Sequence, residues 1–424
     1  MFLPIEAQYP VSFRETQAKE LGTHLHQHNS VVLVGMKRVG ISNFLRFFLT
    51  NPHIPNTYVK SGLLLFVHVD LNDLIDTSPQ AFWILVLKRL IDAIEISALS
   101  VDAKRKADKL FNDSIQVQDL FLTLESVRRA CRLIADEGFA INLFLVRFDR
   151  LQETVTPELF ANLLGLKESL GTRLSYVFTS YRPLTDLRPG IFTKAALGVF
   201  ARDMYLTPAS TSDMKVILQT FLQRYQLRCT PKALAHLLDL AGGHVQYLQL
   251  SLLKLCDLEN VPDNKSELLQ LLTNDEEIRL LGEEIMASLT VDEQIQLKDL
   301  VTHKTKSIAD NSYLRRTGLV TSEQKLFSPL FETAVRSKQA ETTNTELSKK
   351  EHALYQVLQE HIGQVVERDT IIETVWPEQI ETGVTDWAVD RLVARLRQKL
   401  KDQHSPYAIV TIVSRGYKLT KEEL

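Results

Sequence analysis

Four short apolar segments separated by helical patterns are the strongest constraint on how this 424-residue chain folds. The segments are Ser30–Gly35, Leu63–Asp70, Ile141–Phe148 and Leu174–Ser180. Amphipathic stretches lie between them at Ile41–Leu49, Pro79–Leu99, Val117–Glu137 and Pro157–Leu170. Continuously apolar strands that alternate with helices are typical of a parallel sheet covered on both faces. We therefore predict an α/β fold with a parallel sheet over residues 1–204.

The pattern changes near residue 205, where the strands stop. Three helical stretches, Thr211–Leu227, Pro231–Leu240 and Gln246–Leu258, predict a helical lid over residues 205–280. Further helical patterns lead into Tyr313–Val320 and, after a turn, Leu326–Pro329. Two short extended segments after helices favour a winged-helix domain over residues 281–336. The polar residues 337–346 have no apolar periodicity and are predicted to be a linker to a separate unit, residues 347–424.

Composition excludes several classes of protein. Hydrophobic residues make up 45% of the chain and charged residues 24%, which excludes wholesale disorder. The net charge of −3 excludes a chain that is basic throughout, so binding to nucleic acid must come from a local patch. Three widely spaced cysteines fit a reducing cytoplasm. No apolar run approaches the roughly 20 residues of a membrane helix, and we expect a cytoplasmic protein without a membrane partner.

A metal site is weighed at His24, His26 and His28, which alternate along the chain. On a strand, all three would share one face and could bind a metal ion. The stretch has the pattern of a helix end, where only His24 and His28 align. We therefore expect no metal site here.

The loop Gly35–Ser42 follows the first strand and precedes a helix, which is the context that a phosphate-binding loop requires. The usual pattern is G-x-x-x-x-G-K-[ST], but Ile41 stands at the lysine position. That lysine normally supplies the charge that faces the β- and γ-phosphates. The alternative is a loop that only connects a strand to a helix. The candidate nucleotide-binding residues are Gly35, Lys37, Arg38, Gly40 and Ser42.

Residues 10–335 resemble the signal-transducing NTPases of the STAND and AAA+ group. The segment Val146–Leu151 is similar to the D-E-F-D-R-L of that group, and Leu174–Leu184 is similar to the strand that follows it. The segment Ala241–His244 is similar to the G-G-H-P of the helical lid. The resemblance implies a P-loop NTPase-like core with degenerate Walker motifs.

The departures from this family concern charges that catalysis needs. Val146 and Arg147 stand where the family has the acidic pair that holds magnesium and activates water, although Asp149 is kept. Loss of preorganised charge is costly in phosphoryl transfer. We therefore expect a pseudo-NTPase that is not an enzyme, with ATP or ADP binding left open. A further alternative is an active ATPase in which Lys37 or Arg38 supplies the positive charge that the missing lysine would direct at the phosphates.

The last unit has the pattern of a winged helix-turn-helix. A capping box at Ser348 begins the first helix, and Asp369–Val375 gives a second. The third helix is expected over Asp386–Lys401, followed by a hairpin from Tyr407–Ile412 to Tyr417–Leu419. From residue 391 to residue 401 there are five basic residues and no acid. A basic face opposite a buried stripe suits a helix that enters the major groove, and a solvated basic face is the alternative.

Residues 347–420 resemble the OmpR/PhoB-type effector domain. The motif residues include Val375-Trp376, Val389-Asp390, Leu396-Arg397 and Arg415-Gly416-Tyr417. The family's leading four-stranded sheet is expected to be missing, and Trp387 replaces the arginine common at the helix start. Helical position and the resemblance together imply these DNA-binding residues: Trp387, Arg391, Ala394, Arg395, Arg397, Gln398 and Arg415.

The fused domains predict a DNA-binding transcriptional regulator with a STAND-like sensor module. Its partner would be double-stranded DNA, and the sensor state would set whether the carboxy-terminal domain is available for DNA. The NTPase-like module could also self-associate or bind a protein partner. The alternative is a non-catalytic scaffold or adaptor in a defence or transposition complex, tethered to DNA by its carboxy-terminal domain.

Overall fold

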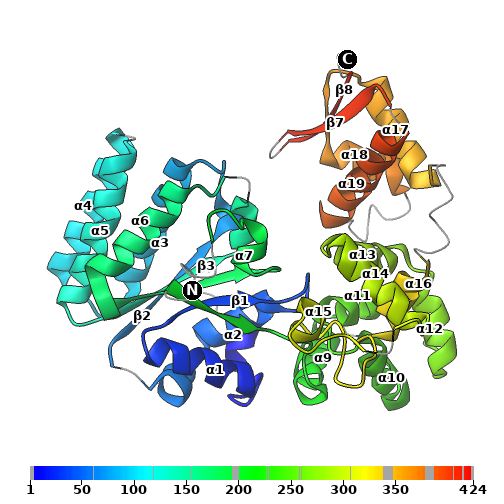
Figure 1. Cartoon of the computed structure of the whole chain (residues 1–424), viewed down its shortest axis with the longest axis horizontal. Coiled ribbons are helices and arrows are strands. Elements are labelled where there is room, and N and C mark those ends of the chain that lie inside the picture. Colours follow the sequence, from blue (N-terminus) through cyan, green and yellow to red (C-terminus); the bar gives the residue numbers. More distant parts are fainter. Residues whose placement is uncertain are drawn as a thin grey trace. The chain divides into compact units, whose positions relative to one another are not determined.

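The computed structural model describes residues 4–421 except 61, 118, 153, 193–199, 226, 228, 257, 259, 306, 338–346, 378–385, 404 and 413–414. The chain forms two compact units, shown in Figure 1. Unit 1 combines Met1–Lys265 with Thr305–Pro329, and unit 2 combines Ser266–Lys304 with Leu330–Leu424. The segment 281–336, expected to form one winged-helix domain, is thus divided between the two units.

Unit 1 is built on a parallel five-stranded sheet in the order β2-β3-β4-β1-β5. Strands β1, β3 and β4 are buried along their whole length because helices cover both faces. The predicted fold class is therefore confirmed. The strands are β1 (Ser30–Val34), β2 (Leu64–Asp70), β3 (Ala140–Val146), β4 (Leu174–Ser180) and β5 (Ala201–Tyr205).

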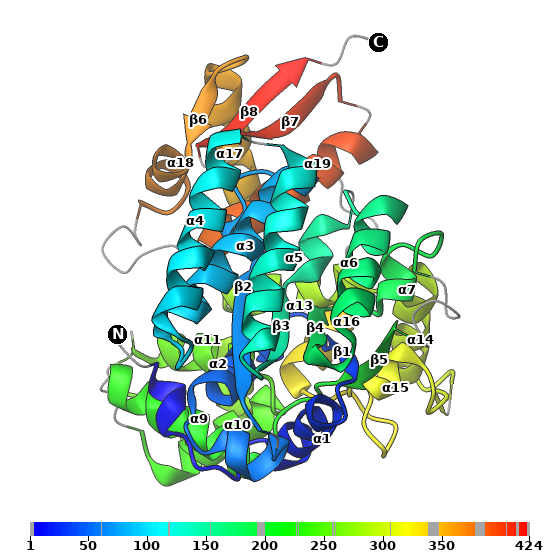
Figure 2. The same ribbon diagram turned by 90° about the vertical axis from the view of Figure 1, so that its left-hand side faces the viewer.

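The helices of unit 1 lie on both faces of this sheet. Helices α1 and α2 lie on one face, and α3, α5 and α6 lie on the other, as Figures 1 and 2 show. On the first face, Phe48 of α2 packs against Phe144 of β3 with ring centroids 6.4 Å apart. On the second face, Trp83 is fully buried. The helices are α1 (Glu15–His26), α2 (Ile41–Thr50), α3 (Pro79–Ile96), α4 (Val101–Val117), α5 (Leu120–Asp136), α6 (Pro157–Leu170) and α7 (Leu184–Leu187).

Three helices follow the sheet in unit 1, as the sequence predicts. They are α9 (Thr211–Tyr225), α10 (Pro231–Ala241) and α11 (Val245–Cys256). Gly242 ends α10 in the left-handed conformation, where its amide N–H bonds to the carbonyl of Leu238 at 3.2 Å. This turn directs the chain into α11. The first residue of α11, Val245, lies against Gly40 of the loop Gly35–Ser42, which is called the glycine-rich loop below.

Unit 2 begins with helices and ends in the predicted winged helix-turn-helix. The antiparallel sheet β6-β8-β7 packs on three helices around buried side chains such as Leu354, Leu396 and Tyr417. Capping boxes at Thr290 and Ser348 begin α14 and α17. The elements are α12 (Lys265–Thr273), α13 (Glu276–Ala287), α14 (Val291–Val301), α16 (Pro329–Ser337), α17 (Lys349–Glu360), β6 (Val365–Glu367), α18 (Arg368–Val375), α19 (Asp386–Asp402), β7 (Tyr407–Ile412) and β8 (Gly416–Lys421). The predicted linker, residues 337–346, lies almost wholly outside the described residues.

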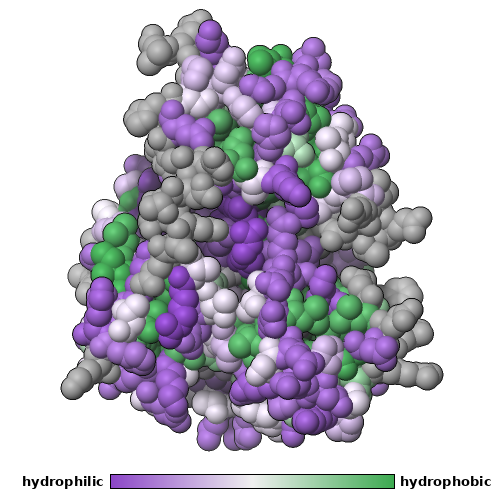
Figure 3. Space-filling view, turned by 90° about the vertical axis from the view of Figure 1, so that its right-hand side faces the viewer, coloured by the Kyte–Doolittle hydropathy of each residue, from purple (hydrophilic) through white to green (hydrophobic). Residues whose placement is uncertain are grey.

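Hydrophilic residues cover most of the face shown in Figure 3. Among the described residues, no helix combines the length and the hydropathy needed to cross a membrane. Nor does the described part of the chain bring three or more histidine, cysteine or acidic side chains together as metal ligands.

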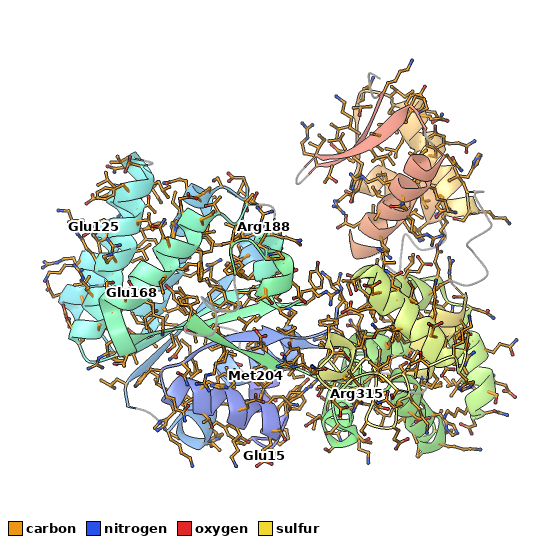
Figure 4. All side chains as sticks on the ribbon, viewed as in Figure 1. Glu15, Glu125, Glu168, Arg188, Met204 and Arg315 are labelled. Carbon is orange, nitrogen blue, oxygen red and sulfur yellow. The ribbon has the colours of Figure 1, made fainter. Side chains whose placement is uncertain are left out.

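Strand β5 (Ala201–Tyr205) is an element that the sequence pattern does not reveal. Arg202 and Asp203 are exposed, so the segment lacks the continuous apolar run of the other strands. Met204, labelled in Figure 4, is only 1% exposed. Because β5 is an edge strand that pairs with β1 alone, it needs few apolar residues.

The extended segment predicted for Tyr313–Val320 is wrong at its start, because Tyr313–Arg316 forms the short helix α15. The side chain of Ser312 caps this helix and accepts a hydrogen bond from its first turn at 3.4 Å. In the part of this segment that the structure describes, extended pairing is limited to an isolated antiparallel bridge between Val320 and Leu326.

Candidate nucleic-acid interface and the glycine-rich loop

Helix α19 has one buried face and one face directed away from the core of its own domain. Val389, Leu392 and Leu396 are fully buried against α17, α18 and β7. At 100° per residue, Arg391, Ala394 and Gln398 fall on the opposite side. Gln398 is exposed, whereas Arg391 and Ala394 are partly covered. The predicted basic face is therefore directed outward, and Trp387 belongs to the same side by position, although its side chain lies outside the described residues.

Arg397 lies at the edge of α19 that faces the hairpin. Its Nε donates a hydrogen bond to the carbonyl oxygen of Ile409 at 2.7 Å, and its Nη2 donates to Thr411 Oγ1 at 2.8 Å. The guanidinium also lies 5.9 Å from the ring centroid of Tyr417. These contacts attach the wing to the third helix, so Arg397 positions the wing whatever else it binds.

Arg395 lies at the other edge of α19, beside α17. Its Nη2 is 2.8 Å from Oε1 of Glu351, and Nζ of Lys399 is 2.7 Å from Oε2 of the same carboxylate. Burial alone would raise the pKa of Glu351, but hydrogen bonds from Lys399 and Ser348 and the neighbouring positive charges lower it overall. Glu351 is therefore a buried anion that holds α17 and α19 together.

A third set of contacts joins the second helix, the third helix and the wing. The hydroxyl of Tyr417 donates a hydrogen bond to Asp390, and Nη2 of Arg368 lies 2.6 Å from Oδ1 of the same carboxylate. Burial and the Asp390 carboxylate both raise the pKa of Tyr417. Sequence reasoning assigned no role to these three side chains. The resemblance motif contains Arg368, Asp390 and Tyr417, but only the fold shows that they meet.

Arg415 occupies the turn of the wing, between β7 and β8. Its side chain is exposed, and its amide N–H bonds to the carbonyl of Ile412 at 3.1 Å. Gly416 follows at the start of β8, and a Cβ there would lie 2.0 Å from the carbonyl oxygen of Val366. Glycine is thus needed for β6 and β8 to approach, and the close approach presents Arg415 at the tip.

The carboxy-terminal domain, residues 347–421, has three helices in the order α17, α18 and α19, a hairpin of β7 and β8, and a basic third helix. Residues 342–419 match the family "Transcriptional regulatory protein, C terminal". The resemblance to OmpR/PhoB-type effector domains is therefore confirmed for this part of the chain. In this transcriptional regulatory domain, α19 is the third helix and β7–β8 is the wing.

The chain is also similar to several solved structures over 76% or more of its length. A Walker-type ATPase of Pyrococcus abyssi is 14% identical, with 76% of this chain and 95% of that chain covered and a TM-score of 0.49. The ORC2 protein of Aeropyrum pernix in its ADP form is 11% identical, with 80% and 87% covered and a TM-score of 0.46. The ORC1 protein of Aeropyrum pernix in complex with DNA is 11% identical, with 100% and 92% covered and a TM-score of 0.41. Similarity at this level says nothing about activity.

In unit 1, the glycine-rich loop Gly35–Ser42 lies in contact with the start of α11, the third helix after the sheet. Gly40 has a φ of 111°, and a Cβ at this position would lie 2.6 Å from Cγ2 of Val245. His244 Nε2 lies 2.9 Å from the carbonyl oxygen of Lys37. Burial lowers the pKa of His244 to about 4, so the ring is neutral near pH 7. Its Nδ1 accepts from the backbone N–H of Tyr247 at 3.3 Å, which leaves the proton on Nε2 to bond with Lys37.

Lys37, a candidate phosphate ligand, has partners within the chain. Its Nζ lies 3.8 Å from Oδ2 of Asp149 and 3.8 Å from the ring centroid of Tyr181. Burial raises the pKa of Asp149, while the charge of Lys37 lowers it. Gly35 bonds through its N–H to the carbonyl of Ser180 at 3.2 Å, which fixes the start of the loop on β4.

Arg147 and Asp70 form an ion pair where β3 and β2 end. The backbone N–H of Arg147 also donates to Thr179 Oγ1 at 2.8 Å. At this end of β3, the side chain of Arg147 is thus a cation that is already paired with a carboxylate.

Proposed function

We propose that this protein is a DNA-binding transcriptional regulator that reads duplex DNA through α19 and the β7–β8 wing. The observation that carries the proposal is the match of residues 342–419 to a transcriptional regulatory family, in a domain whose third helix directs a basic face away from the domain's own core. Arginine suits both phosphate clamps and bidentate contacts to guanine. The outward residues Arg391, Ala394 and Gln398, with Trp387 beside them, would contact DNA, and Arg415 would contact it from the wing.

Arg395 and Arg397, at the two edges of α19, contribute to the proposed interface by positioning its elements. Their side chains are engaged by Glu351 and by the wing, so they hold the helix and the hairpin in the geometry that DNA would meet. Replacement of either should weaken DNA binding through misplaced elements as well as through lost charge. Replacement of Arg415, which is exposed, should act through the lost contact alone.

Genome-wide footprinting, followed by fluorescence anisotropy on the sites found, tests this proposal. We expect discrete promoter sites and an affinity that falls steeply with salt, because phosphate contacts release counterions. Arg415→Ala should weaken binding and reduce the salt slope. Lys232→Ala, which removes an exposed charge from α10 in the other unit, is the matched control. Salt-independent binding, or equal loss in both variants, would contradict the proposal.

The NTPase-like module is proposed to have lost hydrolysis while it keeps a sensing role. Ile41 stands where a phosphate-binding lysine is needed, Lys37 faces Asp149, and Arg147 is paired with Asp70. Hydrolysis would require positive charge directed at the phosphates, whereas the charges of Lys37 and Arg147 face carboxylates of the chain itself. A radiolabelled hydrolysis assay tests this: turnover that Ser42→Ala abolishes would overturn the proposal. ATP or ADP binding is tested separately, by the shift in unfolding temperature that nucleotide causes.

A second candidate function is a scaffold that DNA binding only tethers. The observation that favours it is a group of exposed apolar side chains around the turn between α4 and α5, of which Phe121 is 72% exposed. Exposed apolar patches often contact other proteins. The group consists of Ile115, Val117, Leu120, Phe121 and Leu122. Diffuse footprints, or footprints at the ends of transposable DNA elements, would favour the scaffold. Discrete promoter sites would favour regulation.

A further inference from the structure

Within unit 2, helix α13 contacts helix α19, and Figure 1 shows α13 just below α19. Oε2 of Glu283 lies 3.6 Å from Nε of Arg395, and these side chains are only 18% and 15% exposed. Arg391 is partly buried as well, and burial lowers its pKa while the negative charges of Glu283 and Glu284 raise it. At the first turn of α13, Glu276 Oε2 lies 2.6 Å from Nζ of Lys350 on α17.

This arrangement places carboxylates where a duplex would place phosphates. Arg391 lies on the outward face of α19, and Arg395 lies at the edge of that face. Two packed helices have axes about 8–10 Å apart, which leaves no room for a nucleic-acid backbone between them. The contact with α13 and the contact with DNA are therefore mutually exclusive at Arg391 and Arg395.

The contact between α13 and α19 also leaves hydrogen-bond donors without acceptors, as expected for two surfaces that can separate. Nε of Arg391 and Nη1 of Arg395 are buried, and no described residue offers either atom a hydrogen-bond acceptor. A buried donor without an acceptor costs free energy, and the cost is larger for a charged group. The 3.6 Å approach of Glu283 is longer than a charge-assisted hydrogen bond. DNA phosphates would supply the missing acceptors, so DNA could replace α13.

We propose that α13 is an intramolecular acidic cover that competes with DNA for the basic face of α19. The inference rests on the proposed function and names its regulation. In the closed state, Glu283 and Glu284 hold the positions of phosphate groups, and the regulatory domain binds DNA weakly. Any event in the chain that displaces α13 raises DNA affinity, because the two occupants share one face.

The test uses the full chain and the double variant Glu283→Gln/Glu284→Gln, which keeps side-chain shape and removes the competing charge. The probe is a fluorescein-labelled duplex carrying a site found by footprinting, at one fixed salt concentration. The matched control is Glu267→Gln/Asp292→Asn, which removes two exposed charges from α12 and α14. The cover predicts that the double variant binds at least about fivefold more tightly than the parent chain, and that the control differs little from it.

Hydrogen exchange gives a readout that does not depend on affinity. Added duplex should increase amide exchange in residues 276–287, because DNA uncovers α13, and should decrease it in residues 386–402. In the DNA-free double variant, exchange should rise in both segments. Thermal unfolding of each variant checks that it is folded.

The possible results separate the two proposals. If the parent chain binds duplex but the double variant binds no more tightly than the control, the cover is refuted and the DNA-binding function stands. The same conclusion follows if duplex leaves exchange in residues 276–287 unchanged. If neither the parent chain nor the double variant binds any duplex in dilute buffer, the proposed function falls, and competition by α13 falls with it.

Discussion

Arg395 of α19 and Glu351 of α17 form an ion pair with 2.8 Å between Nη2 and Oε1, and the glutamate side chain is completely buried. The pair joins the helix that is proposed to read DNA to the helix that begins the domain. The capping box of α17 uses the other oxygen of the same carboxylate, because Oε2 accepts from the backbone N–H of Ser348 at 2.7 Å. One side chain thus fixes both the start of α17 and the place of α19.

Replacement of Glu351 by alanine should strongly destabilise the regulatory domain. The change leaves Arg395 and Lys399 without their shared anion, and breaking a buried ion pair from one side costs about 3–5 kcal/mol. Urea unfolding, followed by circular dichroism, measures the loss. Glu360→Ala, at the exposed end of the same helix, should change stability little. Similar losses in the two variants would show that Glu351 has no special role.

The stability of the regulatory domain should fall in acid because of Glu351. Its pKa is lowered in the folded state, so its contribution is complete above the ordinary value of 4.5 and is lost as pH falls through the lower folded value. Glu351→Gln should therefore flatten the pH dependence of unfolding below about pH 4.5. An unchanged acid limb in that variant would contradict the assignment.

His244 should give unit 1 a different pH dependence. Its pKa is lowered from 6.5 to about 4 by burial, so the unfolded chain takes up a proton that the folded chain does not. Stability should be complete above pH 6.5 and decline as pH falls toward 4, by about 3 kcal/mol in total. The variant His244→Asn should lose this dependence, which unfolding of unit 1 between these pH values measures. His26→Asn, an exposed control, should keep it.

The hydroxyl of Tyr417 should matter for DNA binding although it is not placed to touch DNA. Tyr417→Phe removes its bond to Asp390 and loosens the wing from α18 and α19. Hydrogen bonds to charged groups contribute about 1.5–3 kcal/mol, so unfolding should show a loss of that order and anisotropy should show weaker binding. Tyr407→Phe, on the adjacent strand β7, is the control. Full DNA affinity in Tyr417→Phe would mean that the wing needs no such anchor.

The fold was largely readable from local patterns, and the failures have physical causes. Continuous apolar runs revealed β1, β3 and β4, which are buried along their whole length between two layers of helices. Strand β2 was revealed as well, because its sequence is mostly apolar although it lies at an edge of the sheet. Strand β5 was missed since an edge strand tolerates Arg202 and Asp203 on its exposed positions. The amphipathic stretch over residues 117–137 is confirmed as α5 (Leu120–Asp136), which Asp119 caps by accepting from the N–H of Leu122 at 2.9 Å.

Helical periodicity placed Arg391, Arg395 and Arg397 away from the apolar stripe of α19. The periodicity of one helix cannot say which side chains of other elements contact these arginines. Their partners come from α17, α13 and the hairpin, up to 112 residues away for Glu283, and no local pattern encodes such contacts. The loop showed the same limit: Ile41 signals the missing lysine, but only packing brings Asp149 to Lys37.

The amino-acid order alone determined the parallel sheet, the winged helix-turn-helix and the basic character of its third helix, because these depend on periodicity over a few turns or strands. The tertiary structure decided which arginines are already engaged and which face α13 covers. Those outcomes depend on contacts between distant segments, whose free energy arises only when the whole chain has packed.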